Sequence, residues 1–292
     1  MAVLIGPETK VLCQGMTGRA ATFHCGRMLS YGTKLVAGVV PGKGGRRHLD
    51  LPVYDQVREA VDATGANATM VFVPPDNAAV AIIEAIEAEL PLIVCVTERI
   101  PVLDMVRVRQ ALDGTQTRLI GPNSQGILVP GVTQLGVMST VDATRGRIGI
   151  ASRSASLTSE IVLQTTQAGL GQSTTIGVGG DPVHGVDLKT CVKLFVDDPD
   201  TDGIIVIGEI GGTEEEETAE LIADLKPKKP IVALVAGRHA PPERRMGHAG
   251  AFASSSGGGT ALSKISALQS AGVVVAPNAA TVGETMRKAL AA

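Results

Sequence analysis

His248 stands in a setting that suits chemistry better than packing. It lies in the segment RRMGHAGA (residues 244–251), and small residues continue beyond it. Glycine and alanine leave an imidazole accessible and let backbone approach it closely. Because imidazole titrates near neutral pH, it often carries acid–base or covalent chemistry. The pattern therefore indicates either a functional histidine or a loop histidine that is satisfied by a neighbouring group.

Two other features are expected at the same sheet edge as His248. The apolar strand 204–207 leads into Glu209, a carboxylate that either caps the next helix or orients a polar group. The hydroxyl-rich run 154–160 opens a helix expected over 156–167, whose first turn offers N–H groups to an anion. A histidine, a carboxylate that selects its tautomer and a helix N-terminus are what a phosphohistidine requires. The alternative for the hydroxyl residues is a set of N-caps without a ligand.

A glycine-rich turn, GMTGRAA (residues 15–21), follows a strand expected over Lys10–Gln14. Such a turn presents N–H groups to a phosphate, but its spacing is not GxGxxG, and a plain strand–helix turn is the alternative. After the next strand, 34–40, an NAD-binding fold places an acidic residue that holds the ribose. Here Lys43 lies in a cationic loop instead. The loop favours a ligand with an extra phosphate, such as coenzyme A, over NAD; a solvated surface loop is the alternative.

Strands and helices alternate in both halves of the chain. With four Phe, two Tyr and no Trp, the cores must consist of Val, Ile, Leu and Ala, which suits parallel sheets covered by helices. We therefore predict an α/β fold. It comprises a Rossmann-like CoA-binding domain (1–125), a connection (126–146) and a flavodoxin-like doubly wound domain that carries His248 (147–292). Helices are expected at 54–64 and 78–88, among others, the second after a turn at 74–77.

Polar residues recur where the predicted strands end. Thr97 and Glu98 follow one apolar strand, and Asn123 follows another. Ligands of open α/β sheets bind beyond the carboxyl ends of the strands. We therefore expect these residues to lie at the same edge as the glycine-rich turn and Lys43.

The composition disfavours several classes of protein. A net charge of −3 without a basic block argues against a nucleic-acid partner. No apolar run reaches 18 residues, so no membrane span is expected, and the apolar start is too short for a signal peptide. The four cysteines lack metal-site spacing, which predicts no metal site and free thiols in a reducing compartment, the cytoplasm.

The motifs together resemble the α subunits of succinate–CoA ligases (succinyl-CoA synthetases) over nearly the whole chain. They match in order and approximate spacing: QGMTGRAATFH (14–24), PGKGG (41–45), GPN (121–123), SRS (152–154), GGDP (179–182), GEIGG (208–212) and RMGHAGA (245–251). The resemblance implies a β subunit with an ATP-grasp domain that phosphorylates His248 from ATP or GTP with Mg²⁺. It further implies an acyl phosphate of a carboxylic acid, displacement of phosphate by the CoA thiol, an αβ or α₂β₂ assembly and a place in the tricarboxylic acid cycle.

The resemblance also implies roles for individual residues. His248 and Glu209 would be catalytic, with the carboxylate bonded to the active histidine. The residues that would contact CoA are Thr17, Gly18, Arg19, Ala20, Lys43, Val96, Thr97 and Glu98. Those near phosphate or the acid are Asn123, Ser154, Ala155, Ser156 and Ser159.

Three positions depart from the family pattern. Ser159 replaces a tyrosine associated with the acid, Ser124-Gln125 replaces Cys-Pro, and Ala21 replaces a glycine, which would place a methyl group beside the CoA pyrophosphate. Succinate is the expected acid, and malate–CoA ligase or another small-acid ligase is the alternative within the family. Two alternatives from other classes are a degenerate CoA-binding regulatory module and an NAD-dependent oxidoreductase.

Overall fold

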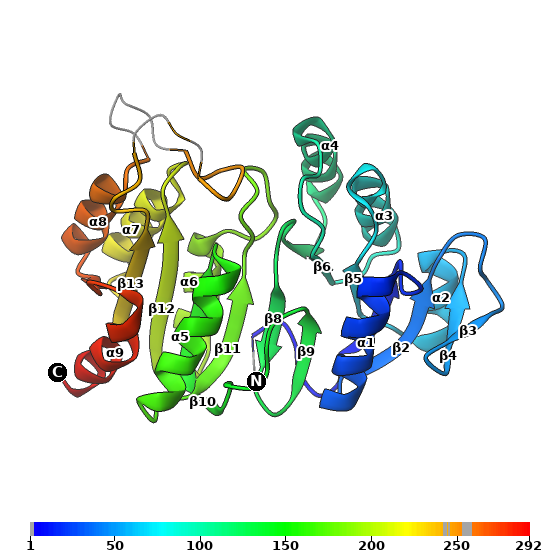
Figure 1. Cartoon of the computed structure of the whole chain (residues 1–292), viewed down its shortest axis with the longest axis horizontal. Helices are drawn as coiled ribbons and strands as arrows, with labels where there is room; N and C mark the ends of the chain where they lie inside the picture. The colour runs from blue at the N-terminus through cyan, green and yellow to red at the C-terminus, as the bar shows by residue number, and fades with distance from the viewer. Residues whose placement is uncertain (1–2, 242–243, 245, 253–258) are drawn as a thin grey trace. The chain divides into compact units, whose positions relative to one another are not determined.

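The computed structural model describes residues 3–241, 244, 246–252 and 259–292 (Figure 1). The chain forms two compact units. The N-terminal unit comprises Leu4–Met138 and Val183–Gly185. The C-terminal unit comprises, within the described residues, Val3, Ser139–Pro182 and Val186–Ala292.

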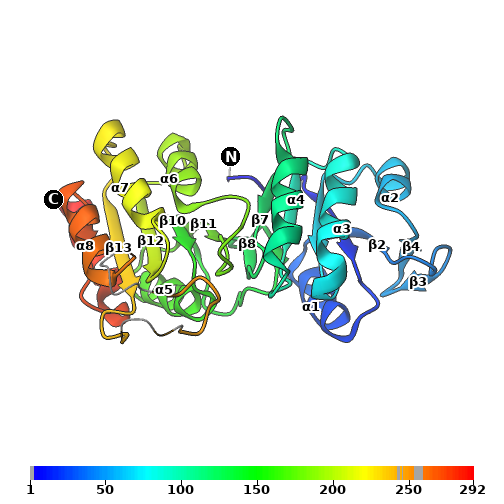
Figure 2. The ribbon, with the colours of Figure 1, turned by 90° about the horizontal axis from the view of Figure 1, so that it is seen from above.

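The N-terminal unit is built on a sheet with strand order β3-β4-β2-β1-β5-β6-β7. All neighbours are parallel except β3 and β4. Its strands are β1 (Lys10–Gln14), β2 (Lys34–Val39), β3 (Arg47–His48), β4 (Leu51–Tyr54), β5 (Ala68–Val71), β6 (Leu92–Cys95) and β7 (Arg118–Ile120). Its helices are α1 (Arg19–Tyr31), α2 (Val57–Thr64), α3 (Pro75–Glu87) and α4 (Val102–Leu112). Helices α2, α3 and α4 lie along one face of the sheet and α1 along the other (Figure 2).

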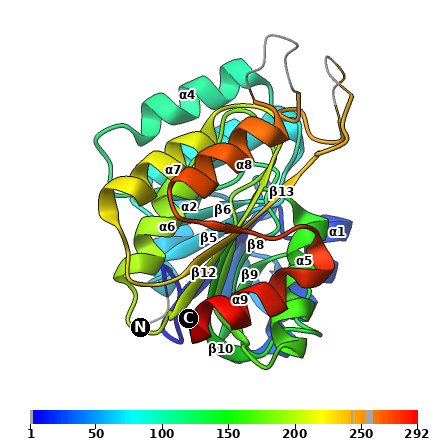
Figure 3. The same cartoon turned by 90° about the vertical axis from the view of Figure 1, so that its left-hand side faces the viewer.

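The C-terminal unit contains parallel strands in the order β14-β13-β12-β10-β11. They are β10 (Arg145–Ser152), β11 (Gln172–Gly177), β12 (Gly203–Glu209), β13 (Ile231–Ala236) and β14 (Val274–Val275). The helices are α5 (Ala155–Gln167), α6 (Leu188–Asp197), α7 (Glu214–Leu225), α8 (Ala261–Ser270), the short η1 (Ala279–Thr281) and α9 (Val282–Ala291). Helices α6, α7 and α8 cover one face, and α5 packs with α9 on the other (Figure 3).

Each sheet reverses its direction of growth once. In the N-terminal unit the chain goes from β1 to β2 on one side and reaches β5 on the other. In the C-terminal unit it goes from β10 to β11 on one side and reaches β12 on the other. Because successive crossover helices then lie on opposite faces, a crevice opens at the carboxyl ends of these neighbouring strands. Ligand sites are expected at both switch points, after β1 and β5 and after β10 and β12.

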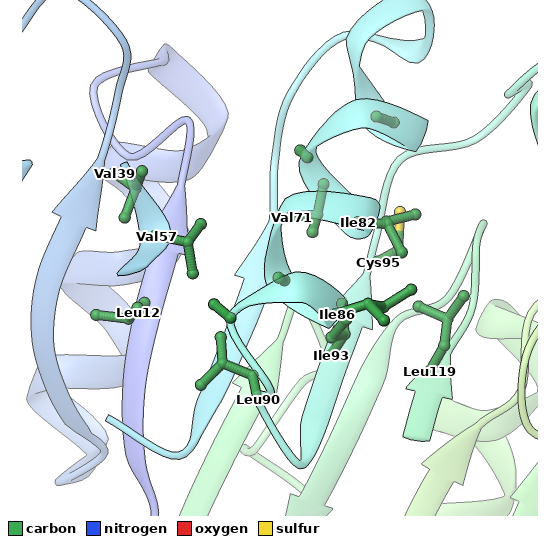
Figure 4. Packing of buried hydrophobic residues seen from close by; sticks show 14 of the residues in the cluster. Leu12, Val39, Val57, Val71, Ile82, Ile86, Leu90, Ile93, Cys95 and Leu119 are labelled. Atoms are coloured by element: carbon green, nitrogen blue, oxygen red, sulfur yellow. The ribbon is translucent and has the colours of Figure 1, made fainter. Parts of the chain in front are cut away.

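Aliphatic side chains form the cores, as the composition predicted. In the N-terminal unit, Leu12, Ile82, Ile86 and Ile93 belong to one buried cluster between the sheet and α3 (Figure 4). In the C-terminal unit, a second cluster includes Ile150 and Ile205 from adjacent strands. Burial of each such side chain stabilises the folded protein by roughly 1.5–3 kcal/mol. This favours continuous apolar strands with helices on both faces of the sheet.

The α/β fold is confirmed, and some elements coincide with their expected bounds, including β1, β7 and α6. The helix expected at 78–88 begins earlier, at Pro75, because proline tolerates the first helical position, where its missing N–H is not needed. The helix expected at 54–64 begins at Val57, since Leu51–Tyr54 pair as β4.

The stretch 126–146, expected to be a connection, contains an antiparallel hairpin of β8 (Gly126–Val129) and β9 (Thr133–Gly136). Two glycines allow it. A Cβ at Gly126 would lie 1.9 Å from the Leu135 carbonyl oxygen, and one at Gly136 would lie 2.4 Å from that of Gln125. The expectation of a connection was therefore wrong for these strands, whereas the domain boundaries as such stay a prediction.

Within the described residues, no helix combines the length and apolarity that a bilayer crossing requires. The longest helices have 13 residues.

The core of the C-terminal unit makes the first prediction. Phe195 on α6 is fully buried and packs over Gly149 of β10, where a Cβ would lie 2.6 Å from the ring. Phe195→Ala should lower the free energy of unfolding by about 3–5 kcal/mol, because it leaves a cavity that rigid neighbours cannot fill. Urea denaturation measures this loss. Leu262→Ala, at a 72% exposed position, is the control and should change it by less than about 0.5 kcal/mol. Similar losses for the two variants would contradict this account.

Candidate active site

The switch point of the C-terminal unit places two charged side chains next to each other. Ser152 at the end of β10 is in register with Ile207 of β12, and Arg153 N–H donates to the Ile207 carbonyl oxygen at 3.0 Å. Glu209 ends β12 two residues later. Both strands are buried along their apolar stretches, so the positions of these two residues are set by the sheet ladder rather than by a loop.

Glu209 and His248, which are 39 positions apart, meet directly. His248 Nδ1 lies 2.8 Å from Glu209 Oε2. A carboxylate only accepts, so Nδ1 carries the hydrogen in this pair, and the neutral ring keeps its lone pair on Nε2. The sequence expectation that the carboxylate selects the tautomer of this histidine is thus met by the geometry. The alternative of a helix-capping Glu209 is not, since Thr213 is the N-cap of α7.

The surroundings raise the pKa of His248 above its ordinary value of 6.5. The hydrogen bond to Glu209 is the main cause, and partial burial opposes it. The charges of Glu209 and Asp181 also raise the pKa, whereas the Arg153 guanidinium lowers it. The proton affinity of the imidazole therefore reflects a balance between two carboxylates and one arginine.

Glycines near His248 leave the space that the ring and its loop occupy. A Cβ on Gly180 would lie 2.5 Å from both Cγ and Nδ1 of the imidazole. A Cβ on Gly211, which has φ +94°, would lie 1.9 Å from the Gly250 carbonyl oxygen. Hydrogen bonds from Ala251 N–H to the His248 carbonyl oxygen and from Met246 N–H to the Ala251 carbonyl oxygen hold the loop. Gly180 of the GGDP segment and Gly211 of the GEIGG segment therefore allow the histidine loop to pack closely against them.

A cavity of about 470 Å³ opens beside the histidine. It is lined by Glu209, Ile210, Ala236, Gly237, Arg238, His239, Ala240, Met246, Gly247, His248 and Ala251. His248 thus has space for a reacting group next to it. Arg244 is exposed, and Arg245 lies outside the described residues.

Helix α5 starts directly after Arg153, as expected for an anion-binding N-terminus. Ser154 is its N-cap and accepts a hydrogen bond from Leu157 N–H at 3.3 Å. Ala155 and Ser156 in the first turn are exposed, and so is Ser159. The Ser154 hydroxyl satisfies one amide of the first turn, while the helix dipole favours negative charge at this end. In the part of the chain that the structure describes, none of these residues hydrogen-bonds to His248, so their role toward phosphate stays a prediction.

The switch point of the N-terminal unit gathers the residues predicted to contact CoA. Gly15, with φ +80°, lies so close to the Phe72 carbonyl that a Cβ would come within 2.8 Å of its oxygen. Gly18 is the N-cap of α1 and supplies no side-chain cap, and Arg19 and Ala20 are exposed. The first turn of α1 is thus a helix N-terminus without a side-chain oxygen in place, which is suited to a phosphate.

Lys43 follows β2, the neighbour of β1, and contacts this turn, whereas Thr97 follows β6, two strands away from β1. Lys43 Nζ donates to Thr17 Oγ1 at 2.7 Å. Thr97 Oγ1 donates to the Val73 carbonyl oxygen at 2.7 Å, and its own carbonyl accepts from Asn123 N–H at 2.8 Å. Lys43 is thus bonded to the turn itself, whereas within the described residues Val96, Thr97 and Glu98 make no hydrogen bond to it.

The departures from the family pattern lie mostly inside the unit. Ala21 is only 1% exposed, so its methyl group packs in the interior. The expectation that it would stand beside the pyrophosphate is wrong, because this side of α1 faces the sheet. Ser124 and Gln125 are also buried, and Ser124 Oγ accepts from Gly126 N–H at 2.8 Å.

Sequence analysis missed the residues behind Glu209. Arg153 was quoted only as part of a motif, and Glu215 and Lys264 were not considered, although both are fully buried. A cation directly after an apolar strand was the one available signal for Arg153.

Comparisons with known proteins identify a family for each part of the chain. Residues 7–99 match the family described as a CoA binding domain, and residues 151–274 match the family described as CoA-ligase. The chain is similar to a succinate–CoA ligase (ADP-forming) subunit alpha from Aquifex aeolicus, with 49% identity over 292 residues. That match covers 99% of this chain and 95% of the relative. A subunit of the same name from Staphylococcus epidermidis is 47% identical, with 98% and 94% covered.

Solved structures share the fold at lower identity. The ATP citrate lyase of Methanothrix soehngenii, in complex with citrate and coenzyme A, superposes with a TM-score of 0.87 at 24% identity. It covers 99% of this chain, which spans about half (50%) of the lyase chain. A dinucleotide-forming acetyl-coenzyme A synthetase from Ca. Korarchaeum cryptofilum gives a TM-score of 0.77 at 20% identity, with 96% and 60% covered.

The bond between Glu209 and His248 predicts a pH dependence. Because the folded pKa of His248 is raised, the stability from this pair is fully present below about pH 6.5 and is lost as the pH rises through the raised value. In Glu209→Gln the pKa should fall, and the amide can donate to Nδ1, which leaves the hydrogen on Nε2. NMR titration of the imidazole measures both changes. His48, which contacts Thr22, is the internal reference. An unchanged His248 titration would contradict the assigned geometry.

Proposed function

The chain belongs to the family of succinate–CoA ligase α subunits, which are acid–thiol ligases, and from this premise we propose that His248 carries a phosphoryl group between a nucleotide and succinate. The observation that carries the proposal is the 2.8 Å contact of His248 Nδ1 with Glu209, which leaves Nε2 as the nucleophile beside a cavity.

The proposed reaction has three steps. Nε2 attacks the γ-phosphorus of ATP or GTP, so that an N–P bond forms as the bond to the nucleoside diphosphate breaks. A carboxylate oxygen of succinate then attacks phosphorus, which breaks the N–P bond and gives succinyl phosphate. Finally the CoA sulfur attacks the acyl carbon, phosphate leaves with the C–O electron pair, and the thiol proton passes to solvent or phosphate. Each step replaces one bond to phosphorus or carbon by another.

Glu209 and the start of α5 have distinct tasks in this proposal. As Nε2 bonds to phosphorus, positive charge develops on the ring, and the carboxylate on Nδ1 stabilises it. The N-terminus of α5, with Ser154, Ala155 and Ser156, would hold phosphoryl oxygens through its amides and dipole. Ser159 is exposed one turn into this helix and would face the acid.

Coenzyme A would bind to the N-terminal unit, whose family match is a CoA binding domain. The amides at the start of α1, from Gly18 to Ala20, suit the pyrophosphate because no side chain caps them. Lys43, held on Thr17, would pair with the ribose 3′-phosphate. Thr97 and Asn123 border the same region.

The relatives are named alpha subunits, which implies a β partner. We propose that this partner has an ATP-grasp domain that binds the nucleotide and Mg²⁺, in an αβ or α₂β₂ assembly. We also propose a cytoplasmic location, which the four buried cysteine thiols support, because thiols persist in reducing compartments.

The CoA assignment predicts a selective loss of affinity. Lys43→Ala should weaken binding of CoA about 10-fold, because one charge-assisted hydrogen bond to the 3′-phosphate is lost. Binding of dephospho-CoA, which lacks that phosphate, should be nearly unchanged. Isothermal titration of the purified chain measures both affinities. Lys34→Ala, at the other end of β2, is the matched control. Equal losses for the two ligands would place the 3′-phosphate elsewhere.

The phosphohistidine predicts a specific modification. After co-expression with the adjacent β-type subunit, wild-type complex incubated with ATP and Mg²⁺ should incorporate acid-labile, base-stable phosphate into this chain. His248→Asn should abolish incorporation while leaving CoA affinity intact. Radiolabel counting and mass spectrometry of the modified peptide measure this. Undiminished labelling of the variant would refute the proposal, and thioester assays with succinate and malate would identify the acid.

A further inference from the structure

A buried ionic cluster lies next to Glu209. Its members are Arg153, Glu215 and Lys264, whose side chains are 4%, 0% and 0% exposed. Burial of charged groups costs several kcal/mol per ion, and apolar replacements are often as stable. The three residues touch no part of His248 according to the contacts of the described residues, so the reaction as proposed leaves them without a task.

Glu215 is the centre of this cluster. Its Oε1 accepts from the backbone N–H of Glu209 at 2.9 Å and from Arg153 Nη1 at 3.1 Å. Its Oε2 accepts from Lys264, which also donates to Glu216 at 3.0 Å and to the Gly212 carbonyl oxygen at 3.0 Å. A glycine is needed at 208, because a Cβ there would lie 2.5 Å from the Glu215 side chain. These contacts tie the first turn of α7, and also helix α8, to the end of β12.

Arg153 connects this centre to the carboxylate of Glu209. Its Nη1 also donates to the Gly211 carbonyl oxygen at 3.1 Å, which fixes the guanidinium plane. Its Nη2 lies 3.3 Å from Glu209 Oε1, and its Nε lies 3.8 Å from Glu214 Oε2. Burial works against the arginine charge, but Glu215, Glu209 and Glu214 together raise its pKa, so the guanidinium stays charged.

Glu209 therefore has a different partner for each oxygen. Oε2 contacts His248, and Oε1 faces the guanidinium without accepting a hydrogen bond from any described residue. The Glu209 side chain is buried, and Arg153 is the cation that lies beside its Oε1. Removing it would leave a buried carboxylate balanced by the imidazole alone.

We infer that Arg153 is a positioning residue for phosphoryl transfer, which holds Glu209 Oε1 so that Oε2 remains on His248 Nδ1, and that Glu215 holds Arg153 in turn. The inference rests on the proposed function of His248. Arg153 acts through Glu209, because within the described residues its side chain makes no hydrogen bond to the imidazole.

The charge of Arg153 has a second consequence for His248. Carboxylates face the site from several elements: Glu209 from β12, Asp181 from the loop after β11, and Glu214, Glu215 and Glu216 from α7. The cations are Arg153 before α5 and Lys264 on α8, and Arg238 and His239 line the nearby cavity. The guanidinium lowers the pKa of His248, whereas the charges of Glu209 and Asp181 raise it. Because only the neutral ring has a lone pair on Nε2, Arg153 also preserves the nucleophile near neutral pH.

The test compares Arg153→Gln with Arg153→Lys in the co-expressed complex. Rapid-quench measurement of the rate of His248 phosphorylation over pH 5.5–9 gives a profile that rises as the imidazole loses its proton. In Arg153→Gln the rate at pH 7 should fall at least about 10-fold, and the acidic limb should move up by roughly half a pH unit or more. Arg153→Lys retains the charge, so its acidic limb should stay near that of the wild type while the rate recovers partly.

Lys264→Met is the matched control within the cluster. It removes an equally buried cation that does not contact Glu209, so it should lower stability without moving the acidic limb. The inference would be overturned if the loss of phosphorylation rate in each variant matched its smaller folded fraction and every pH–rate profile kept the wild-type shape. So would an equal displacement of the limb in Lys264→Met and Arg153→Gln.

A second variant covers the case in which Arg153→Gln does not fold. Glu215→Gln keeps an oxygen for the Glu209 N–H but removes the charge that holds Arg153. Glu215→Gln should slow phosphorylation, and Arg153→Lys should have a smaller effect in the Glu215→Gln background than in the wild-type background. Full activity of Glu215→Gln with an unchanged pH profile would overturn the inference. The proposed function fails separately, if the wild-type complex does not phosphorylate His248 at all.

Discussion

The hydrogen bond between His248 Nδ1 and Glu209 Oε2 is the interaction on which the chemistry proposed for the C-terminal unit depends. It is directional, so its two partners must be held to within a few tenths of an ångström. The carboxylate is fixed because it ends a buried strand, and the imidazole is fixed by a loop that packs on Gly180 and Gly211. The same bond decides which ring nitrogen keeps a lone pair, and hence whether the ring can act as a nucleophile.

A bond of this kind cannot be isolated from the charges around it. A nearly buried carboxylate raises the proton affinity of its partner, and an imidazole that stays protonated is inert toward phosphorus. The guanidinium of Arg153 opposes that tendency from the other side of Glu209. One carboxylate oxygen of Glu215 accepts from both the backbone N–H of Glu209 and the side chain of Arg153. Position and charge are therefore supplied by the same few contacts, which explains why so many ions are buried here.

Both units use the same geometric device to create a site. Where successive crossovers leave a parallel sheet in opposite directions, the carboxyl ends of two neighbouring strands lie under a gap that no helix covers. In the N-terminal unit this gap holds Gly15 and the first turn of α1. In the C-terminal unit it holds Arg153 and Glu209. The two sites differ mainly in side chains, because uncapped amides suit a bound phosphate and a carboxylate suits an imidazole.

Local patterns of the sequence determined the alternation of strands and helices, the strand-end positions of Glu209 and Thr97, and the small-residue setting of His248. These features depend on residues close in the chain, and resemblance to a family supplied the reaction. Tertiary structure alone decided that Ala21 packs inward, that 126–136 forms a hairpin and that Glu215 is buried. The physical reason is the same in each case. Which side chain is buried, and which charges meet, depends on contacts between segments tens of residues apart, and local periodicity contains no information about them.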